Sequence, residues 1–393
     1  MKNITCISLI VSTLVTTAFA DVNTMFHNAK VKGQIRTLHS FIDSDSSENV
    51  YATVLGGSLK YELTPYNGFN GAAKFVTTKN ITPLSGEDEN YNDALSSQKG
   101  EYTQLVEGYM NYKFNTLNVR VGRQNIDTPL ADSDDIAMVA NTFEAVDVSY
   151  MQDVLSLEMG YLREWQGADV GLEDPWLTTG KDGTYFLGLS YSTCMFETNF
   201  WLYNINGEKD DEIANNSIYT DAILNYEIQN IKISTALQYL QQVELDSSGI
   251  ESSIYGISSE IGVKDITFSF AYNKSLKQSQ KQSFSGFGGG TLFTNMDSMI
   301  VDAISADRDA DALVVGFGYE YKGINFSYAY GDFNGDKDSQ AKEEHIVEQD
   351  LSITYNYKDI NIEAIYAQND DTKNTNSNDG DWKNLRVLVK YDF

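Results

Sequence analysis

The chain has 393 residues and a formal net charge of −28 at pH 7, and it contains 25 Tyr and 19 Phe but only 4 Pro. The negative charge excludes a nucleic-acid-binding protein, because such proteins attract phosphates with basic patches. Two cysteines give neither a disulfide framework nor a metal-ligand spacing. Many aromatic residues with little proline are typical of a closed β-sheet, in which every strand needs its backbone donors.

The N-terminus has the three parts of a cleavable signal peptide. A basic start at Lys2 precedes an apolar run over residues 4–15 and small residues at Ala18 and Ala20. We predict that residues 1–20 are the signal peptide and that residues 21–393 form one domain. Removal of Lys2 leaves 27 Lys and Arg against 56 Asp and Glu, a net charge of −29. No later apolar run reaches the length of a membrane-spanning helix.

Alternating strands of about ten residues fill the rest of the chain. Two-residue turns such as Lys264-Asp265, Lys322-Gly323 and Lys358-Asp359 join some strands, and long polar loops join the others. This asymmetry is typical of an outer-membrane barrel, and a barrel of about eighteen strands encloses a water-filled lumen. The predicted strands start near Lys30, Val50, Phe69, Tyr102, Leu117, Phe143, Leu155, Tyr185, Cys194, Tyr219, Ile231, Ser253, Ile266, Leu313, Ile324, Glu348, Ile360 and Trp382.

The last strand ends at the final residue of the chain. Leu385, Val387, Val389, Tyr391 and Phe393 alternate with polar residues and give the strand one apolar face. A terminal aromatic residue on such a strand resembles the signal that the barrel-assembly machinery recognises. We therefore predict an all-β, transmembrane antiparallel β-barrel in the bacterial outer membrane. Its partners would be outer-membrane lipid, lipopolysaccharide and small solutes, and it would be a monomer or a homotrimer.

Alternation also assigns side chains to the lumen. Because the apolar residues of the last strand face lipid, its charged residues face inward, and the first strand must pair with it to close the barrel. One wall then carries a basic ladder: Lys32, Arg36, Lys60, Lys74, Arg120, Arg386 and Lys390. An acidic wall opposite carries Glu227, Glu260, Glu320, Glu348, Asp350 and Glu363. Such facing charges would orient dipolar solutes, although they could also simply keep the lumen wet.

Two other segments have motif-like spacing. Asp332, Asn334, Asp336, Asp338 and Glu343 occupy positions 1, 3, 5, 7 and 12 of a calcium loop, but the glycine stands at Gly335 rather than two residues later. A structural Ca²⁺ is one interpretation, and a solvated acidic loop is the other. We expect no other cofactor. The glycine-rich stretch 286–290 lacks the context of a phosphate loop, and we expect its loop, residues 277–310, to dip into the lumen, with helical spacing over residues 295–306.

The fifth strand and the loop after it carry a family resemblance. Val121-Gly122-Arg123-Gln124 is followed by Thr128-Pro129-Leu130, then by Asp134, then by Thr142-Phe143. This pattern resembles the OprD-like outer-membrane porins and, with the strand count, covers essentially the whole mature chain. The resemblance implies an eighteen-stranded barrel, inward-folded third and seventh loops, a basic ladder, and passive uptake of small, often carboxylate-bearing solutes such as amino acids or organic acids.

In this chain the resemblance places the pore constriction at Arg123, Asp132, Asp134 and Asp135. The family often has an arginine shortly after the loop's aspartate, whereas here Asp134-Asp135 lead into Ile136. That difference favours a constriction that prefers cations.

The sequence therefore predicts a porin and not an enzyme. A serine and a histidine paired on the barrel wall would mark a membrane hydrolase, and the three histidines, at His27, His39 and His345, show no such spacing. The competing hypothesis is a structural or adhesive surface barrel with calcium-binding acidic loops and a closed lumen.

Overall fold

The computed structural model describes residues 24–44, 48–87, 90–92, 101–171, 176–207, 212–278, 280–338, 341–373 and 381–393. The predicted signal peptide, residues 1–20, lies outside the described residues. Strands dominate the described part of the chain. They are β1 (Lys30–Ser44), β2 (Val50–Glu62), β3 (Phe69–Asn80), β4 (Tyr102–Phe114), β5 (Leu117–Gln124), β6 (Thr142–Gln152), β7 (Leu155–Gln166), β8 (Leu177–Thr178), β9 (Thr184–Ser192), β10 (Phe196–Ile205), β11 (Asn215–Ile228), β12 (Ile231–Glu244), β13 (Ser252–Val263), β14 (Ile266–Leu276), β15 (Ala310–Tyr321), β16 (Ile324–Gly335), β17 (Glu344–Tyr357), β18 (Ile360–Asp371) and β19 (Trp382–Asp392).

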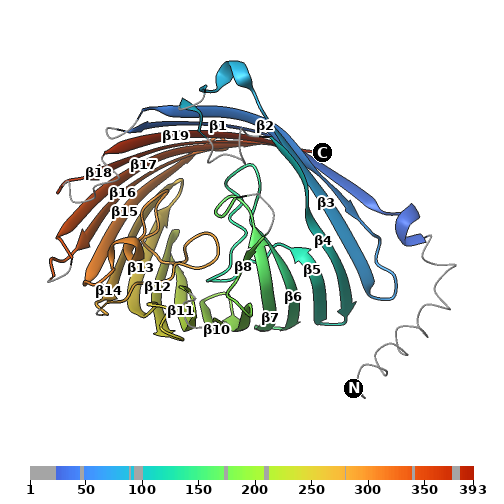
Figure 1. Cartoon of the computed structure of the whole chain (residues 1–393), viewed down its shortest axis with the longest axis horizontal. Coiled ribbons are helices and arrows are strands. Elements are labelled where there is room, and N and C mark those ends of the chain that lie inside the picture. Colours follow the sequence, from blue (N-terminus) through green and yellow to red (C-terminus); the bar gives the residue numbers. More distant parts are fainter. Residues whose placement is uncertain are drawn as a thin grey trace.

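The strands form one antiparallel sheet that closes on itself (Figure 1). Each long strand pairs with its neighbours in the chain, and β19 pairs with β1. The short strand β8 pairs with the end of β7, while β7 also pairs directly with β9, so β8 stands outside the ring. The predicted closed antiparallel barrel of eighteen strands is confirmed, with one extra two-residue strand.

Closure runs to the last residue of the chain. The β1–β19 register extends from Gln34↔Asp392 to Ser44↔Trp382. Beyond it, Gly33 and Phe393 exchange two backbone hydrogen bonds of 2.8 and 2.9 Å. A side chain at position 33 would collide with the Phe393 ring, because a Cβ there would lie 2.1 Å from it. The terminal aromatic residue thus completes the ladder instead of leaving an unpaired edge.

Short turns fix the register of the hairpins at one end. Lys264, Lys322 and Lys358 have φ between 51° and 55°, the left-handed conformation that tight hairpin turns require. Strands that follow these turns begin at the predicted residue. Some strands that follow long loops begin earlier than predicted: β11 begins four residues before Tyr219, and β17 four residues before Glu348. The additional residues are mostly polar, so they carry no apolar alternation.

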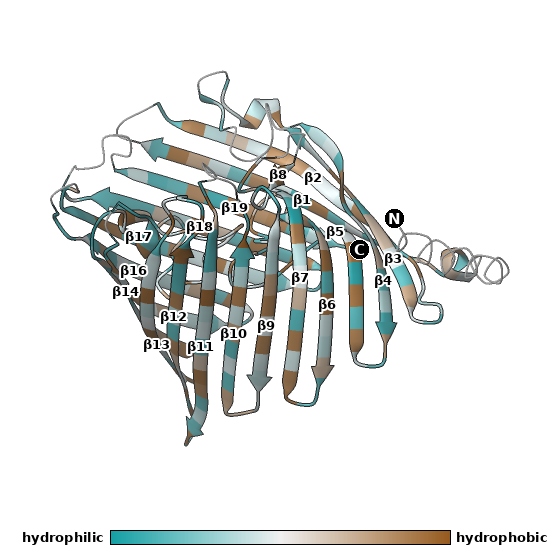
Figure 2. Cartoon of the chain, turned by 60° about the horizontal axis from the view of Figure 1, so that its bottom comes forward, coloured by the Kyte–Doolittle hydropathy of each residue, from teal (hydrophilic) through white to brown (hydrophobic). Residues whose placement is uncertain are grey.

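The outer face of the ring is apolar. Alternate residues such as Leu59, Val121, Leu237, Ile257 and Tyr391 are 40–57% exposed, and their exposed neighbours on adjacent strands are also aliphatic or aromatic. In Figure 2 hydrophobic and hydrophilic residues alternate along the strands from β6 to β11. No helix within the described residues is long and apolar enough to cross a membrane.

The inside of the ring is filled in part by two loops. Residues 125–141, between β5 and β6, and the described residues of the segment between β14 and β15, 277–278 and 280–309, lie within the circle of strands in Figure 1. Ile126 and Leu130 from the first loop and Phe287 and Met299 from the second share one buried cluster with inward residues of the barrel. The predicted inward fold of the third loop is confirmed. The helical spacing over residues 295–306 yields only a short 3₁₀ helix, η5 (Val301–Ile304), because the segment is anchored at several points by hydrogen bonds from outside it.

A charge on the outer face should cost far more than the same charge in the lumen. Ile257 faces outward near the middle of β13, and the next residue, Ser258, faces inward. In a membrane barrel, Ile257→Arg should lower the free energy of unfolding from lipid by about 2–4 kcal/mol, and Ser258→Arg by much less. Urea titration of the two variants in lipid vesicles measures both. Equal losses would mean that this face does not meet lipid.

Candidate pore constriction

The third loop enters the barrel at the end of β5. Gln124 is fully buried, and its side-chain amide donates to the backbone oxygen of Ala145 at 3.1 Å. The loop then meets the seventh loop, residues 277–309. The N–H of Asp132 donates to the Phe287 oxygen, and the N–H of Phe287 donates to the Leu130 oxygen, both at 2.9 Å. The two loops therefore support each other inside the ring.

A glycine makes this close approach possible. Gly288 has φ +96°, and a Cβ there would lie 2.3 Å from the backbone oxygen of Asp132. Only glycine adopts this conformation without strain and leaves room for the neighbouring carbonyl. The glycine-rich stretch of the seventh loop therefore allows its backbone to lie against the backbone of the third loop.

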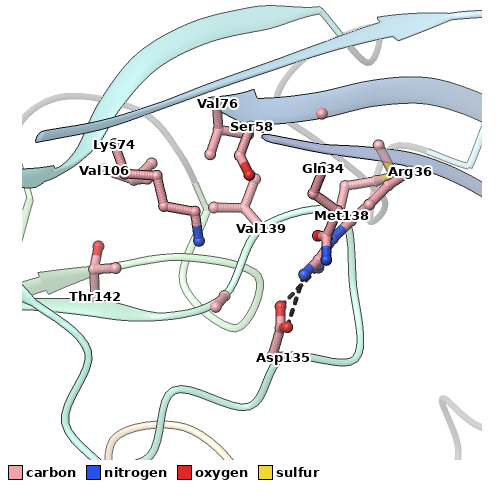
Figure 3. Close-up of a pocket in the computed structure, with 12 residues that line it drawn as sticks. Gln34, Arg36, Ser58, Lys74, Val76, Val106, Asp135, Met138, Val139 and Thr142 are labelled. Carbon is pink, nitrogen blue, oxygen red and sulfur yellow. Dashed lines mark hydrogen bonds and ion pairs between the residues drawn. The ribbon is translucent and has the colours of Figure 1, made fainter. Parts of the chain in front are cut away.

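The far end of the third loop is fixed to β1 and β19. Both terminal nitrogens of Arg36 donate to the carboxylate of Asp135, at 2.6 and 2.7 Å (Figure 3). One of them also donates to the Ala137 oxygen at 2.8 Å. The Lys390 ammonium donates to the Asp135 backbone oxygen at 2.9 Å. Burial alone would raise the pKa of Asp135, but the hydrogen bonds and the charge of Arg36 outweigh burial and lower this pKa.

Apolar packing supports the same attachment. Met138 and Val139 of the loop share a buried cluster with inward residues of β1, β2 and β19, among them Leu38, Val54 and Leu388. The loop is thus held to the wall by a bidentate ion pair and by an apolar contact directly beside it.

Other cations of the predicted basic ladder also have partners inside the protein. Lys60 and Lys74 share the carboxylate of Glu107, at 2.7 and 3.4 Å, and the Glu107 side chain is only 5% exposed. The Arg120 guanidinium lies 4.6 Å from the centre of the Tyr109 ring. Lys32 lies 3.3 Å from Glu62, in a more exposed pair.

The seventh loop is attached to the wall by carboxylates. Both oxygens of Glu348, on β17, accept backbone N–H groups of the loop, from Ser298 at 3.0 Å and from Met299 at 2.7 Å. Asp350 accepts the N–H of Asp297 at 3.1 Å, and Arg386 of β19 donates to the Asp297 carboxylate at 2.5 Å. Glu348 is completely buried, so its role is to hold the loop and not to meet solutes.

Between the two loops lies a chamber of about 600 Å³. Its lining includes Asp132 and Asp134 from the third loop, Asp297 from the seventh, and Asp350 and Arg386 from the wall. Neither Asp132 nor Asp134 forms an ion pair with any residue that the structure describes. Burial and the nearby carboxylates of Asp169 and Asp132 raise the pKa of Asp134 to about 6.

The predicted acidic residues are spread around the ring. Glu227 and Glu260 line a second cavity of about 600 Å³ near the short turns, with Lys232 between them. Glu320 is exposed on β15. Glu348, Asp350 and Glu363 belong to β17 and β18, the two strands that precede β19 in the ring, and so do not lie across the lumen from it. Only part of the predicted acidic wall therefore stands opposite the basic ladder.

Arg123 does not join the three aspartates. It stands two residues after the outward-facing Val121 on the same strand, so alternation turns it to the outer face. There its guanidinium lies 4.2 Å from the centre of the Trp176 ring. The family pattern alone suggested Arg123, and by strand parity its side chain points away from the lumen.

The residues of the calcium-loop spacing have partners of other kinds. Asp332 lies 3.2 Å from His345, Asp338 lies 2.6 Å from Lys277, and Glu343 lies 3.0 Å from Lys373. Among the described residues, no three His, Cys, Asp or Glu side chains are grouped as metal ligands. Calcium binding in this loop stays a prediction.

Sequence reasoning missed Glu107 and Asp297, the partners of three ladder cations. Glu107 could have been found, since the outward Met110 and Phe114 put odd-numbered residues of β4 in the lumen. Asp297 could not, because loops have no alternation.

Loss of the Glu348 carboxylate should release the seventh loop. Glu348→Ala leaves the N–H groups of Ser298 and Met299 without an acceptor, which costs about 1–3 kcal/mol for a buried donor left unsatisfied, so their exchange with deuterium should quicken at least about fivefold. Hydrogen exchange in detergent micelles, read on peptides covering residues 297–300, measures this. The matched control is Glu320→Ala, with an exposed side chain. Unchanged exchange in the Glu348 variant would mean that the loop is held elsewhere.

No protein-family model and no curated protein sequence matches this chain significantly. Solved structures do match it in fold. OccAB4 of Acinetobacter baumannii superposes with a TM-score of 0.79 at 16% sequence identity, over 93% of this chain and 98% of that one. OpdK of Pseudomonas aeruginosa, solved with vanillate, gives 0.77 at 17% identity, over 94% and 99%. OccK5 (OpdH) of the same organism gives 0.76 at 13% identity, over 94% and 99%.

These structures are matched along nearly their whole length, so the likeness covers the entire barrel. The resemblance to the OprD-like porins noted in the sequence is therefore confirmed for the fold: this chain has the eighteen-stranded barrel of those porins.

Proposed function

We propose that the protein is an outer-membrane porin through which small polar or charged solutes, such as amino acids, organic acids and ions, diffuse passively. The observation that carries this proposal is the chamber between the third and seventh loops, inside a ring that is apolar outside and charged inside. A ring of this many strands is too wide for side chains alone to fill, and the two loops narrow it.

The outer face supports a location in the outer membrane. Its band of aliphatic and aromatic residues suits lipid, and a closed ring leaves no unpaired backbone edge in it. Acidic loops at the end opposite the short turns would meet lipopolysaccharide and its divalent cations. Assembly by the barrel-assembly machinery, cleavage of residues 1–20 and a monomeric or trimeric state belong to the same proposal.

The proposal predicts discrete conductance steps. Purified protein added to a planar lipid bilayer in KCl should give stepwise current increases, and its band in an unheated gel should migrate differently after boiling. A lumen closed by the two loops, as in a structural or adhesive barrel, would give the gel shift without any current. That result would overturn the porin function and leave the fold intact.

The ion preference should depend on pH through Asp134. Its carboxyl is mostly neutral well below its pKa of about 6 and mostly charged above it, so the negative charge beside the chamber grows as pH rises. The groups facing it are Asp169, Asp132, Asp135 and Arg386. Charges inside the pore act within about 8 Å of a passing ion at physiological salt, which is the Debye length.

The permeability ratio of K⁺ to Cl⁻ should therefore rise between about pH 5 and about pH 7.5, by up to about fivefold, since one charge at about 4 Å in water contributes about 1 kcal/mol. Reversal potentials across a KCl gradient measure the ratio. Asp134→Asn should remove most of the rise. Asp246→Asn, in the exposed sixth loop, should keep it. An unchanged pH dependence in the Asp134 variant would place this residue outside the ion path.

A further inference from the structure

The charge balance of the constriction is set by pairing within the protein. Six of the seven residues of the basic ladder form ion pairs with carboxylates, and the seventh, Arg120, stacks on Tyr109. The partners belong to the lumen wall, as Glu62 and Glu107 do, or to the loops, as Asp135 and Asp297 do. A solute would have to compete with these partners for the cations.

The two arginines that hold the loops are the least available. Arg36 uses both terminal nitrogens on Asp135, and its side chain is 7% exposed. Arg386 is bound to Asp297, whose side chain is 8% exposed, and Asp297 is in turn part of the attachment of the seventh loop. A carboxylate from a solute could bind either arginine only by breaking an attachment of a loop.

Two carboxylates of the chamber, unlike these arginines, are not engaged in ion pairs. Asp132 and Asp134 line it without an ion-pair partner among the described residues. Asp350, another lining residue, adds a third carboxyl group, and Arg386 is the one basic residue of the lining. The space open to a solute therefore offers oxygen acceptors, while its cationic donors are already engaged.

Resting on the porin function proposed above, we propose that this pore takes organic cations, with ammonium or guanidinium groups, and does not require a carboxylate on the solute. The ammonium or guanidinium would be drawn to Asp132 and Asp134. The paired ladder would keep the two loops in place instead of binding the solute. The preference for cations follows from the carboxylates of the chamber that form no ion pair within the protein.

The test compares solutes that differ in one group. Agmatine is arginine without its carboxylate, and succinate is a dianion smaller than either. Uptake into proteoliposomes should be at least as fast for agmatine as for arginine, and at least about fivefold faster than for succinate, the factor that one nearby charge produces in water. Slower uptake of agmatine than of arginine, in a protein that conducts KCl, would show that the carboxylate is required and would overturn this inference. Absence of KCl conductance would contradict the porin function itself.

Variants separate the chamber from general surface charge. Asp132→Asn with Asp134→Asn should slow agmatine uptake at least about fivefold relative to an uncharged sugar of similar size, since about fivefold is the effect of one nearby charge in water and two carboxylates near the path are lost. The control, Asp246→Asn, should change neither rate. A double variant that takes up agmatine at the unaltered rate would assign the preference elsewhere and contradict the role of the chamber. Uptake of the sugar by each variant shows that its barrel is folded and open.

Discussion

The backbone hydrogen bonds between β1 and β19 are the constraint on which the rest of the structure depends. A sheet of this size with two free edges would expose unpaired donors and acceptors to lipid, where each costs several kcal/mol. Pairing the first strand with the last removes both edges and creates an inside. Only then can charged residues, loops and water share a space separated from the apolar outer face. Phe393 is part of this closure, since its backbone N–H and C=O both form hydrogen bonds with the backbone of Gly33.

The charged residues inside the barrel hold the two inward loops in place and do more than keep the lumen hydrated. Arg36 and Lys390 hold the third loop, and Glu348, Asp350 and Arg386 hold the seventh. Wall cations thus hold the third loop, and wall carboxylates together with Arg386 hold the seventh. What the loops leave between them is a chamber with surplus negative charge. The shape of the constriction and its electrostatics therefore come from one set of contacts.

Alternation predicted most of the barrel, because period-two patterning and tight turns are local signals. The strands that follow Lys264-Asp265, Lys322-Gly323 and Lys358-Asp359 begin where the sequence indicates. The same parity placed Arg36, Lys74 and Arg386 in the lumen. The same parity turns Arg123 away from the lumen. Arg123 was included on family resemblance alone, and its guanidinium lies 4.2 Å from the centre of the Trp176 ring.

Pairing inside the lumen was beyond local signals. The contact of Arg36 with Asp135 joins residues 99 positions apart, and that of Arg386 with Asp297 joins residues 89 apart. Loops have no periodicity to reveal such contacts, so the sequence showed a ladder of cations without showing that most of them are neutralised. The expected helix over residues 295–306 failed for the same reason, because attachments to Glu348 and Asp350 override the local pattern.

Closure with a defined register is the central claim, and a disulfide tests it most directly. Thr37 and Val389 face each other across β1 and β19. In a Cys194→Ser background, cysteines at positions 37 and 389 should form a disulfide under mild oxidation. Cysteines at 37 and 385 should not, because four residues along a strand separate them by about 13 Å, beyond the reach of a disulfide. A bond in the first pair alone confirms the closed ring in this register. No bond in the first pair, or equal bonding in both, would contradict it.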